Sequence, residues 1–141
     1  MSKLTLEKAQ QIITVALAKA REAGYKPMGV AVIDEGGNLV AFAREDEASM
    51  FRFDVAMAKA WGAVGMGVSS RVLGQRAKDN PNFFVSLAAA AHGRFLPQTG
   101  AVLIKDGTGR TLGAVGASGG TGDEDEIICA AGVQAAGYAC D

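Results

Sequence analysis

The chain has little of what several classes of protein depend on. Of its 141 residues only 6% are aromatic, one is histidine and two are cysteine, and its formal charge is −1. Zinc sites need three or four donor side chains, and nucleic acids are bound by basic clusters and aromatic platforms. The sequence therefore predicts no zinc site and no nucleic-acid partner.

Long apolar runs are also missing. The N-terminal segment MSKLTLEKAQ has no apolar stretch of the signal-peptide kind, and no run approaches the ~18 residues of a membrane-spanning helix. Cys129 and Cys140 lack the CxxC spacing of redox or metal sites. We therefore expect a cytoplasmic protein with reduced thiols, no membrane partner and a single domain over residues 1–141.

The hydrophobic pattern predicts the element order α-ββ-ααα-ββ-α. Helical periodicity follows a cap at Thr5 and stops at Gly24, and two apolar runs around a DEGGN turn form a β-hairpin. A second hairpin surrounds a DGTG turn. The hairpin strands are predicted at 29–33, 39–42, 101–104 and 111–115, and the three central helices begin at Ser49, near Arg71 and at Asn80-Pro81.

Both strands of the first hairpin are apolar without polar alternation, which favours strands covered on both faces. The expected fold class is α+β: an antiparallel sheet from two β-hairpins, flanked by helices on both faces in three layers. On the final helix we expect Ile127/Ile128, Ala131, Ala135 and Tyr138 to point inward, and Gly132 to mark a close crossing.

The stretch TLGAVGASGGTGDEDE, residues 111–126, runs from an apolar strand through glycines into four acids. The amides of Ser118–Thr121 could form an anion-binding nest at the start of the next helix. The acids Asp123–Glu126 would repel a polyanion at this position, and they already complement the positive end of the helix dipole, so no nucleotide is expected. Two interpretations remain open: the acids only cap the helix, or Asp125 or Glu126 faces a ligand.

Lys59 lies in the middle of a small-residue helix with no acid at i±3 or i±4. Its ammonium must therefore reach water, a distant acid or a ligand carboxylate. We expect Lys59 and the Asp125/Glu126 pair to share one cleft, against the alternative that the lysine is solvated and the acids act as caps. His92 precedes a glycine at a predicted helix end, where capping is its commoner role.

Three segments carry a resemblance to a known family: residues 29–49 (GVAVIDEGGNLVAFAREDEAS), 54–63 (DVAMAKAWGA) and 106–126, where SGG precedes an acidic pair. The chain resembles the GlcG/HbpS-like haem-binding family, which also forms the C-terminal domain of PduO-type cobalamin adenosyltransferases. The resemblance implies a profilin-like fold, homo-oligomers and haem or a related tetrapyrrole as ligand.

The chain departs from the family pattern in two places. The segment TGAVLI, residues 99–104, replaces a PGGVPI-type sequence, and no histidine lies in the first helix or the first hairpin. A histidine iron ligand from that region therefore has no counterpart. Haem would instead use Tyr25, Met50, Lys59, His92 or a non-histidine oxygen.

Two functions follow from the sequence. The resemblance implies a protein that binds or handles haem or a related tetrapyrrole. The alternative is an enzyme or accessory protein acting on a small hydroxy or keto acid, in a cleft lined by Arg44, Lys59 and Asp125/Glu126. The catalytic candidates are Lys59, Asp125 and Glu126, and the expected ligand contacts are Arg44, Asp46, Lys59, Ser118, Gly119, Gly120, Asp125 and Glu126.

Overall fold

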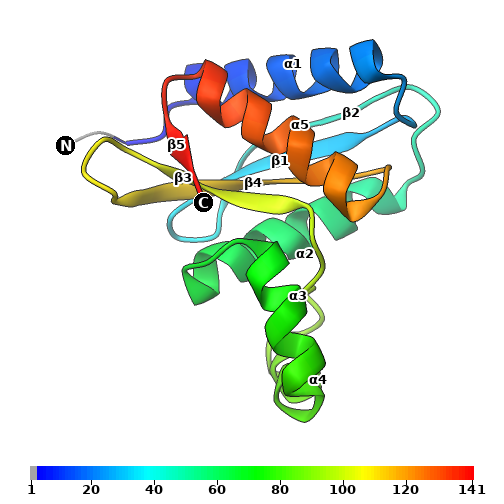
Figure 1. Cartoon of the computed structure of the whole chain (residues 1–141), viewed down its shortest axis with the longest axis vertical. Helices are drawn as coiled ribbons and strands as arrows, with labels where there is room; N and C mark the ends of the chain where they lie inside the picture. The colour runs from blue at the N-terminus through cyan, green and yellow to red at the C-terminus, as the bar shows by residue number, and fades with distance from the viewer. Residues whose placement is uncertain (1–2) are drawn as a thin grey trace.

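The computed structural model describes residues 3–141, so Met1 and Ser2 of the N-terminal segment lie outside the described residues. The described chain has the predicted element order, with one short strand added at its end (Figure 1). No helix within residues 3–141 is both long and apolar enough to cross a membrane. The elements are α1 (Leu6–Ala23), β1 (Gly29–Asp34), β2 (Leu39–Arg44), α2 (Phe51–Met66), α3 (Ser70–Asp79), α4 (Pro81–Ala90), β3 (Ala101–Lys105), β4 (Thr111–Ser118), α5 (Gly122–Ala135) and β5 (Ala139–Cys140).

The strands form one antiparallel sheet in the order β2-β1-β4-β3-β5. The two predicted hairpins join where β1 pairs with β4, in a register that sets Gly29 opposite Ser118 and Asp34 opposite Gly113. The terminal strand β5 pairs with β3 at the far edge. This arrangement brings the end of β4 beside the start of β1, next to the glycine turn that precedes α5.

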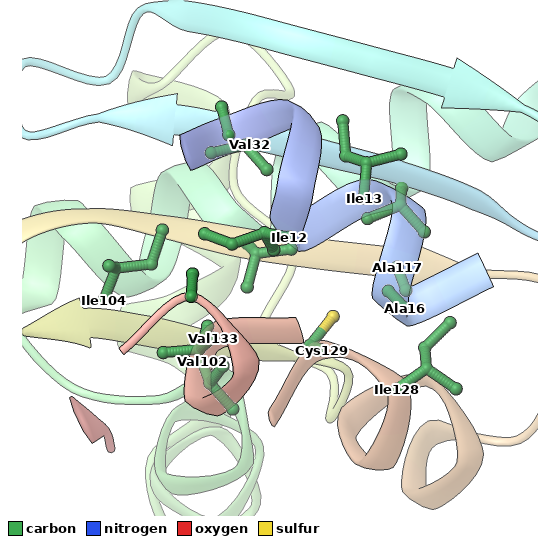
Figure 2. Close-up of a cluster of buried hydrophobic side chains, with 14 of the residues drawn as sticks. Ile12, Ile13, Ala16, Val32, Val102, Ile104, Ala117, Ile128, Cys129 and Val133 are labelled. Atoms are coloured by element: carbon green, nitrogen blue, oxygen red, sulfur yellow. The ribbon is translucent and has the colours of Figure 1, made fainter. Parts of the chain in front are cut away.

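Helices cover both faces of the sheet, as predicted. α1 and α5 lie together on one face, α2 lies across the other, and α3 and α4 project beyond the sheet on the α2 side (Figure 1). The larger core fills the space between α1, α5 and the sheet, where Ile12, Val32 and Ile128 are fully buried (Figure 2). A smaller cluster under α2 contains Ala60, Ala63 and Leu103.

Two glycines allow elements to approach more closely than any side chain would permit. A Cβ at Gly132 would lie 2.5 Å from the Ile12 carbonyl oxygen, which confirms the predicted close crossing of α5 over α1. A Cβ at Gly116 would lie 2.3 Å from the Ala56 carbonyl oxygen. The backbone of β4 therefore rests directly on α2, along the row of small residues on that helix.

The helix ends follow local chemistry. The Thr5 hydroxyl accepts a hydrogen bond from the Lys8 amide, and Gly24 ends α1 in the left-handed conformation, with φ 72°. Thr121 and Glu124 form a capping box at the start of α5. Ser49 was predicted as the cap of α2, but the helix begins at Phe51 after Met50, and the Ser49 hydroxyl accepts from the Phe51 amide.

One prediction about burial was wrong and one was wrong in part: on α5, Ile128 is buried and Tyr138, just after the helix, packs against the core as predicted, but Ile127 and Ala135 are exposed. β2 is an edge strand, so its residues are exposed or half-buried rather than covered on both faces. On α5 the buried face contains Asp125, Ile128, Cys129, Gly132 and Val133, whereas Ile127 is 45% exposed. The buried face of α5 is thus turned by about one residue from the predicted face. Gly132 and Asp125 lie on the buried side, in place of some of the larger apolar residues.

Candidate functional site

The glycine turn after β4 packs tightly against Pro27, just before the start of β1. Gly119 has φ 151°, and a Cβ there would lie 2.3 Å from the Pro27 carbonyl oxygen, so only glycine fits without displacing the backbone. The Gly120 amide donates to Asp125 Oδ1 at 3.0 Å, and the Thr121 amide donates to Glu124 Oε1 at 3.0 Å. These two amides of the predicted nest therefore bind carboxylates of the chain itself.

Lys59 and Asp125 form a buried ion pair at this turn. Lys59 Nζ lies 2.9 Å from Asp125 Oδ2 and also donates to the Ala117 carbonyl oxygen at 3.1 Å. Lys59 is 5% exposed and Asp125 1% exposed. The structure thus joins the lysine on α2 to an acid on α5, and Asp125 is more than a capping residue.

Gly100 helps enclose the pair. A Cβ at this position would lie 2.6 Å from Lys59 Nζ and 3.1 Å from the Asp125 Cβ, and the residue has φ 137°. Both the backbone conformation and the space therefore require glycine. The segment leading into β3 packs directly against the two charged groups.

Burial is the main influence on the Asp125 carboxyl. Removal from water raises its pKa above the ordinary value of 3.8, while the Lys59 ammonium and the Gly120 amide partly oppose that rise. The Lys59 ammonium donates to two acceptors, and the Asp125 carboxylate accepts from two donors. The pair is therefore a buried ion pair held in a fixed position beside a pocket.

The pocket next to the pair has a volume of about 530 Å³. Its wall includes Arg52 and Lys59 from α2, Thr99 from the segment before β3, and Ser118, Gly120 and Asp125 from the glycine turn and the start of α5. Of the ligand contacts predicted from sequence, this pocket brings together Lys59, Ser118, Gly120 and Asp125.

The other predicted contacts lie elsewhere. Glu126 turns to the surface, where its carboxylate accepts from Arg71 Nε at 3.1 Å. Arg44 and Asp46 are exposed around the end of edge strand β2 and do not line this pocket. Gly119 lines a neighbouring pocket with Tyr25.

Sequence reasoning missed Arg52. It precedes Lys59 by seven residues on α2, which places both side chains on one face of the helix. Its Nε is buried and has no hydrogen-bond partner among the described residues. The helical spacing was a usable signal, because it aligns a second cation with the lysine that had been singled out.

A second hollow, of about 370 Å³, lies on another side of α2. Its wall includes Phe53, Met57 and Trp61 from α2, and His92 and Arg94 from the loop after α4. We call it the His92 hollow. Its surface is mainly apolar, in contrast to the polar pocket at Arg52.

His92 follows the end of α4, as predicted, in a left-handed conformation with φ 56°. Its imidazole makes no hydrogen bond to another described residue, so the side chain does not cap the helix. Beside it, the Arg94 guanidinium lies 4.4 Å from the centroid of the Trp61 ring, and Arg94 Nε donates to the Ala91 carbonyl oxygen. The loop thus presents one imidazole and one fixed cation to an apolar wall.

Comparison with known proteins relates the chain to one family, by sequence and by fold. A sequence model of the HbpS-like family, described as "haem degrading protein HbpS-like", matches residues 4–134. An uncharacterised 15.0 kDa protein from the dhaT-dhaS intergenic region of Citrobacter freundii is 27% identical over 139 residues, covering 87% of this chain and 92% of that protein.

Solved structures share the fold over nearly the whole chain. A double mutant of HbpS from Streptomyces reticuli is 27% identical with a TM-score of 0.82, covering 96% of this chain and 88% of the other. The protein ORFY of Klebsiella pneumoniae is 26% identical with a TM-score of 0.85, covering 96% and 92%. The PduOC:haem complex has a TM-score of 0.86 over 97% of both chains at 22% identity, which is a likeness of fold.

Proposed function

This chain belongs to the family of HbpS-like haem-degrading proteins, and we propose that it binds haem or a related tetrapyrrole in the His92 hollow. One observation carries the choice of site. The only histidine of the chain lines an apolar hollow together with Trp61, the only tryptophan. An apolar wall with few polar groups is the usual setting for a flat, mostly apolar ligand.

The residues of the His92 hollow fit the chemistry of haem. Imidazole is the commonest protein ligand of haem iron, and the thioether of Met57 on the same wall is another ligand type. Trp61 and Phe53 offer aromatic surface to the macrocycle. When bound, haem supplies a redox-active iron, and the chain would hold it through His92 and shield one face from water.

Charge at the rim also suits a tetrapyrrole. Haem carries propionate groups, and the Arg94 guanidinium lines the same hollow in an orientation held by Trp61 and by the Ala91 carbonyl. Arginine binds carboxylates in a paired geometry that lysine lacks. Asp54 also lines the hollow, and it would repel a propionate, which favours the Arg94 side for these groups.

The other candidate iron ligands fit less well. Lys59 is engaged in the buried pair with Asp125, and Met50 is 71% exposed without a surrounding wall. Tyr25 lines a different pocket, among Lys26, Gly119 and Glu124, with no aromatic neighbour in its wall. The proposal therefore assigns the iron to His92 rather than to these residues.

We also propose that the protein forms a homo-oligomer. Met50, Phe51 and Phe53 are exposed at the start of α2, next to the His92 hollow. A hollow of this size covers only part of a macrocycle, so a second copy covering the outer face would complete the site. Light scattering at micromolar concentration is expected to give a multiple of 14.5 kDa, and the monomer mass would contradict this proposal.

The binding proposal is tested by titrating the protein with haem and following the Soret band. We expect saturable binding by the wild type and a loss of most of the spectral shift in His92→Ala. Tyr25→Phe is the matched control, because it removes the oxygen of the rival ligand and should leave the spectrum unchanged. Absence of binding by the wild type, or loss of the shift in Tyr25→Phe alone, would overturn the proposal.

A further inference from the structure

We propose that the polar pocket beside the Lys59–Asp125 pair is a second ligand site, which binds the carboxylate group of a small organic acid on Arg52. The inference stands on the contacts of this pocket and does not depend on haem binding in the His92 hollow. It assigns a role to Arg52, which neither the fold nor the proposed function uses.

Arg52 is an incompletely paired cation in a partly buried place. Its Nε is shielded from solvent, yet no described residue accepts a hydrogen bond from it, and the side chain takes part in no ion pair within residues 3–141. A buried N–H without an acceptor is unfavourable, and more so when the group is charged. A ligand oxygen bound by the guanidinium would offset that penalty, and Arg52 lines the pocket in which such a ligand would lie.

The acids around the pocket already have partners. Asp125 is paired with Lys59, and Asp123 is paired with the Arg71 guanidinium, which reaches it from α3. Arg52 is close enough to Asp125 to influence the carboxyl electrostatically, but the two make no hydrogen bond. Arg71 also pairs with Glu126, so the charges of this region nearly balance, and the case for a ligand rests on the Arg52 guanidinium, whose buried Nε has no hydrogen-bond partner among the described residues.

Two further donors line the same wall. An ammonium has three N–H groups, and Lys59 uses two of them on Asp125 and Ala117, so the third remains. Ser118 is 2% exposed, lines the pocket, and its hydroxyl makes no hydrogen bond to another described residue. A guanidinium, an ammonium and a hydroxyl thus belong to residues that line the same pocket.

The acids around the pocket favour a carboxylate over a phosphate. The guanidinium fork can pair with two oxygens of either group, so the choice between them rests on charge. A dianion would face Asp123 and Asp125 at the start of α5, and the Gly120 and Thr121 amides that could offset this are already bound to the chain's own acids. The site is therefore suited to a small monocarboxylic acid.

The site is distinct from the His92 hollow. Arg52, Val55 and Lys59 line one side of α2, whereas Phe53, Met57 and Trp61 line another. At about 100° per residue, these two rows lie well apart around the helix axis. A propionate of a haem held in the His92 hollow therefore has to pass around α2 to reach Arg52, and a free acid is the simpler occupant.

The test uses ¹H–¹⁵N NMR of the full chain, following the Arg52 Nε–H signal and the Gly120 and Gly122 amides during titration with acetate and, separately, pyruvate. We expect saturable shifts of these signals in the wild type. In Arg52→Gln the dissociation constant should rise roughly ten-fold or more, as for the loss of a charge-assisted hydrogen bond. Arg76→Gln, which removes an exposed arginine of α3, is the matched control and should bind as the wild type does.

Lys59 and Asp125 stay intact in both variants, so the fold of the pocket is preserved. Arg52→Lys is a further variant, which keeps the positive charge but loses the forked guanidinium. Weaker binding by Arg52→Lys than by the wild type is expected. If neither acid shifts these signals, or if Arg52→Gln binds as tightly as the wild type, the proposal is wrong. Tighter binding of inorganic phosphate than of acetate would overturn the choice of a monocarboxylate.

Two further arms separate this site from haem. Acetate titrated in the presence of saturating haem should give the same dissociation constant, and Arg52→Gln should leave the Soret titration unchanged. If haem instead displaces acetate and Arg52→Gln weakens haem binding, the carboxylate at Arg52 is a haem propionate and the free-acid assignment is overturned. Failure of haem to bind at all would remove the proposed function while leaving the acetate result standing.

Discussion

Lys59 Nζ and the Asp125 carboxylate lie 2.9 Å apart, although the two residues are separated by 66 positions in the sequence. The pair connects α2 on one face of the sheet with the first turn of α5 on the other, around the end of β4. Buried ion pairs of this kind contribute little net stability but are costly to break singly. We therefore regard the pair as fixing the position of α5 and of the glycine turn relative to α2.

The first prediction is that Lys59 and Asp125 are energetically coupled. A double-mutant cycle with Lys59→Met and Asp125→Asn should give a coupling free energy of about 1–3 kcal/mol in urea unfolding, because each single change leaves a buried polar group unpaired. The same cycle with Glu126→Gln should be additive within about 0.5 kcal/mol, since Glu126 pairs with Arg71. Additivity in the Asp125 cycle would mean that the pair does not organise the site.

The second prediction concerns pH. Burial raises the pKa of Asp125 and Lys59 opposes the rise, so the Lys59→Met variant should have a still higher Asp125 pKa in its folded state. When the pKa of a carboxyl is higher in the folded than in the unfolded state, the protein is most stable below the unfolded-state pKa. That stability is lost as the pH rises through the folded-state pKa. The destabilisation caused by Lys59→Met should therefore shrink on acidification from about pH 7 to about pH 5.

Urea unfolding of wild type and Lys59→Met over this range measures the effect, and the carboxyl ¹³C shift of Asp125 reports its titration directly. Lys105→Met is a suitable control, because its partner Asp141 has a side chain that is 66% exposed. If the loss of unfolding free energy caused by Lys59→Met does not change with pH, burial does not raise the pKa of Asp125 as argued.

The third prediction tests the crossing of α5 over α1. Gly132→Ala should destabilise the protein by about 1–3 kcal/mol, because the new methyl group meets the Ile12 carbonyl at 2.5 Å and the helices must separate. Gly107→Ala adds a methyl group that has no neighbour within 4 Å and should change stability by less than about 0.5 kcal/mol. Thermal unfolding of both variants gives the comparison, and equal melting temperatures would show that the crossing tolerates a side chain.

The fourth prediction is a large difference in thiol reactivity. Cys129 is fully buried in the main core (Figure 2), and burial raises the pKa of its thiol, so the reactive thiolate is scarce. Cys140 is half-buried at the edge of the sheet. Iodoacetamide should label Cys140 in the folded protein and Cys129 only in denaturant, as read by peptide mass spectrometry. Rapid native labelling of Cys129 in a Cys140→Ser variant would contradict the packing described for α5.

Sequence reasoning reached the element order, the sheet type and the proximity of Lys59 to the Asp125/Glu126 segment, without deciding which acid meets the lysine. Periodicity and caps fix the helices, and a mid-helix lysine without a nearby acid left three choices, which were water, a distant acid or a ligand. The family to which the chain belongs was likewise indicated by its own motifs.

What sequence reasoning missed depends on tertiary neighbours. The apolar residues of β2 suggested a strand covered on both faces, but β2 lies at the edge of the sheet and is exposed or half-buried. Asp125 and Glu126 are adjacent and chemically alike, and only the tertiary structure shows that Asp125 meets Lys59 while Glu126 meets Arg71. Helical spacing aligns Arg52 with Lys59, but the burial of its Nε depends on tertiary neighbours that the sequence pattern does not show.

The central claim is that the single histidine of this chain holds haem iron in the hollow against Trp61. It is tested most directly by electron–nuclear double resonance on the ferric haem complex of untagged protein labelled with ¹⁵N only in histidine, where any ¹⁵N coupling to the iron must come from His92. We predict a directly coordinated ¹⁵N signal that disappears in His92→Ala. A saturated haem complex without ¹⁵N coupling would contradict the assignment of His92 as the iron ligand.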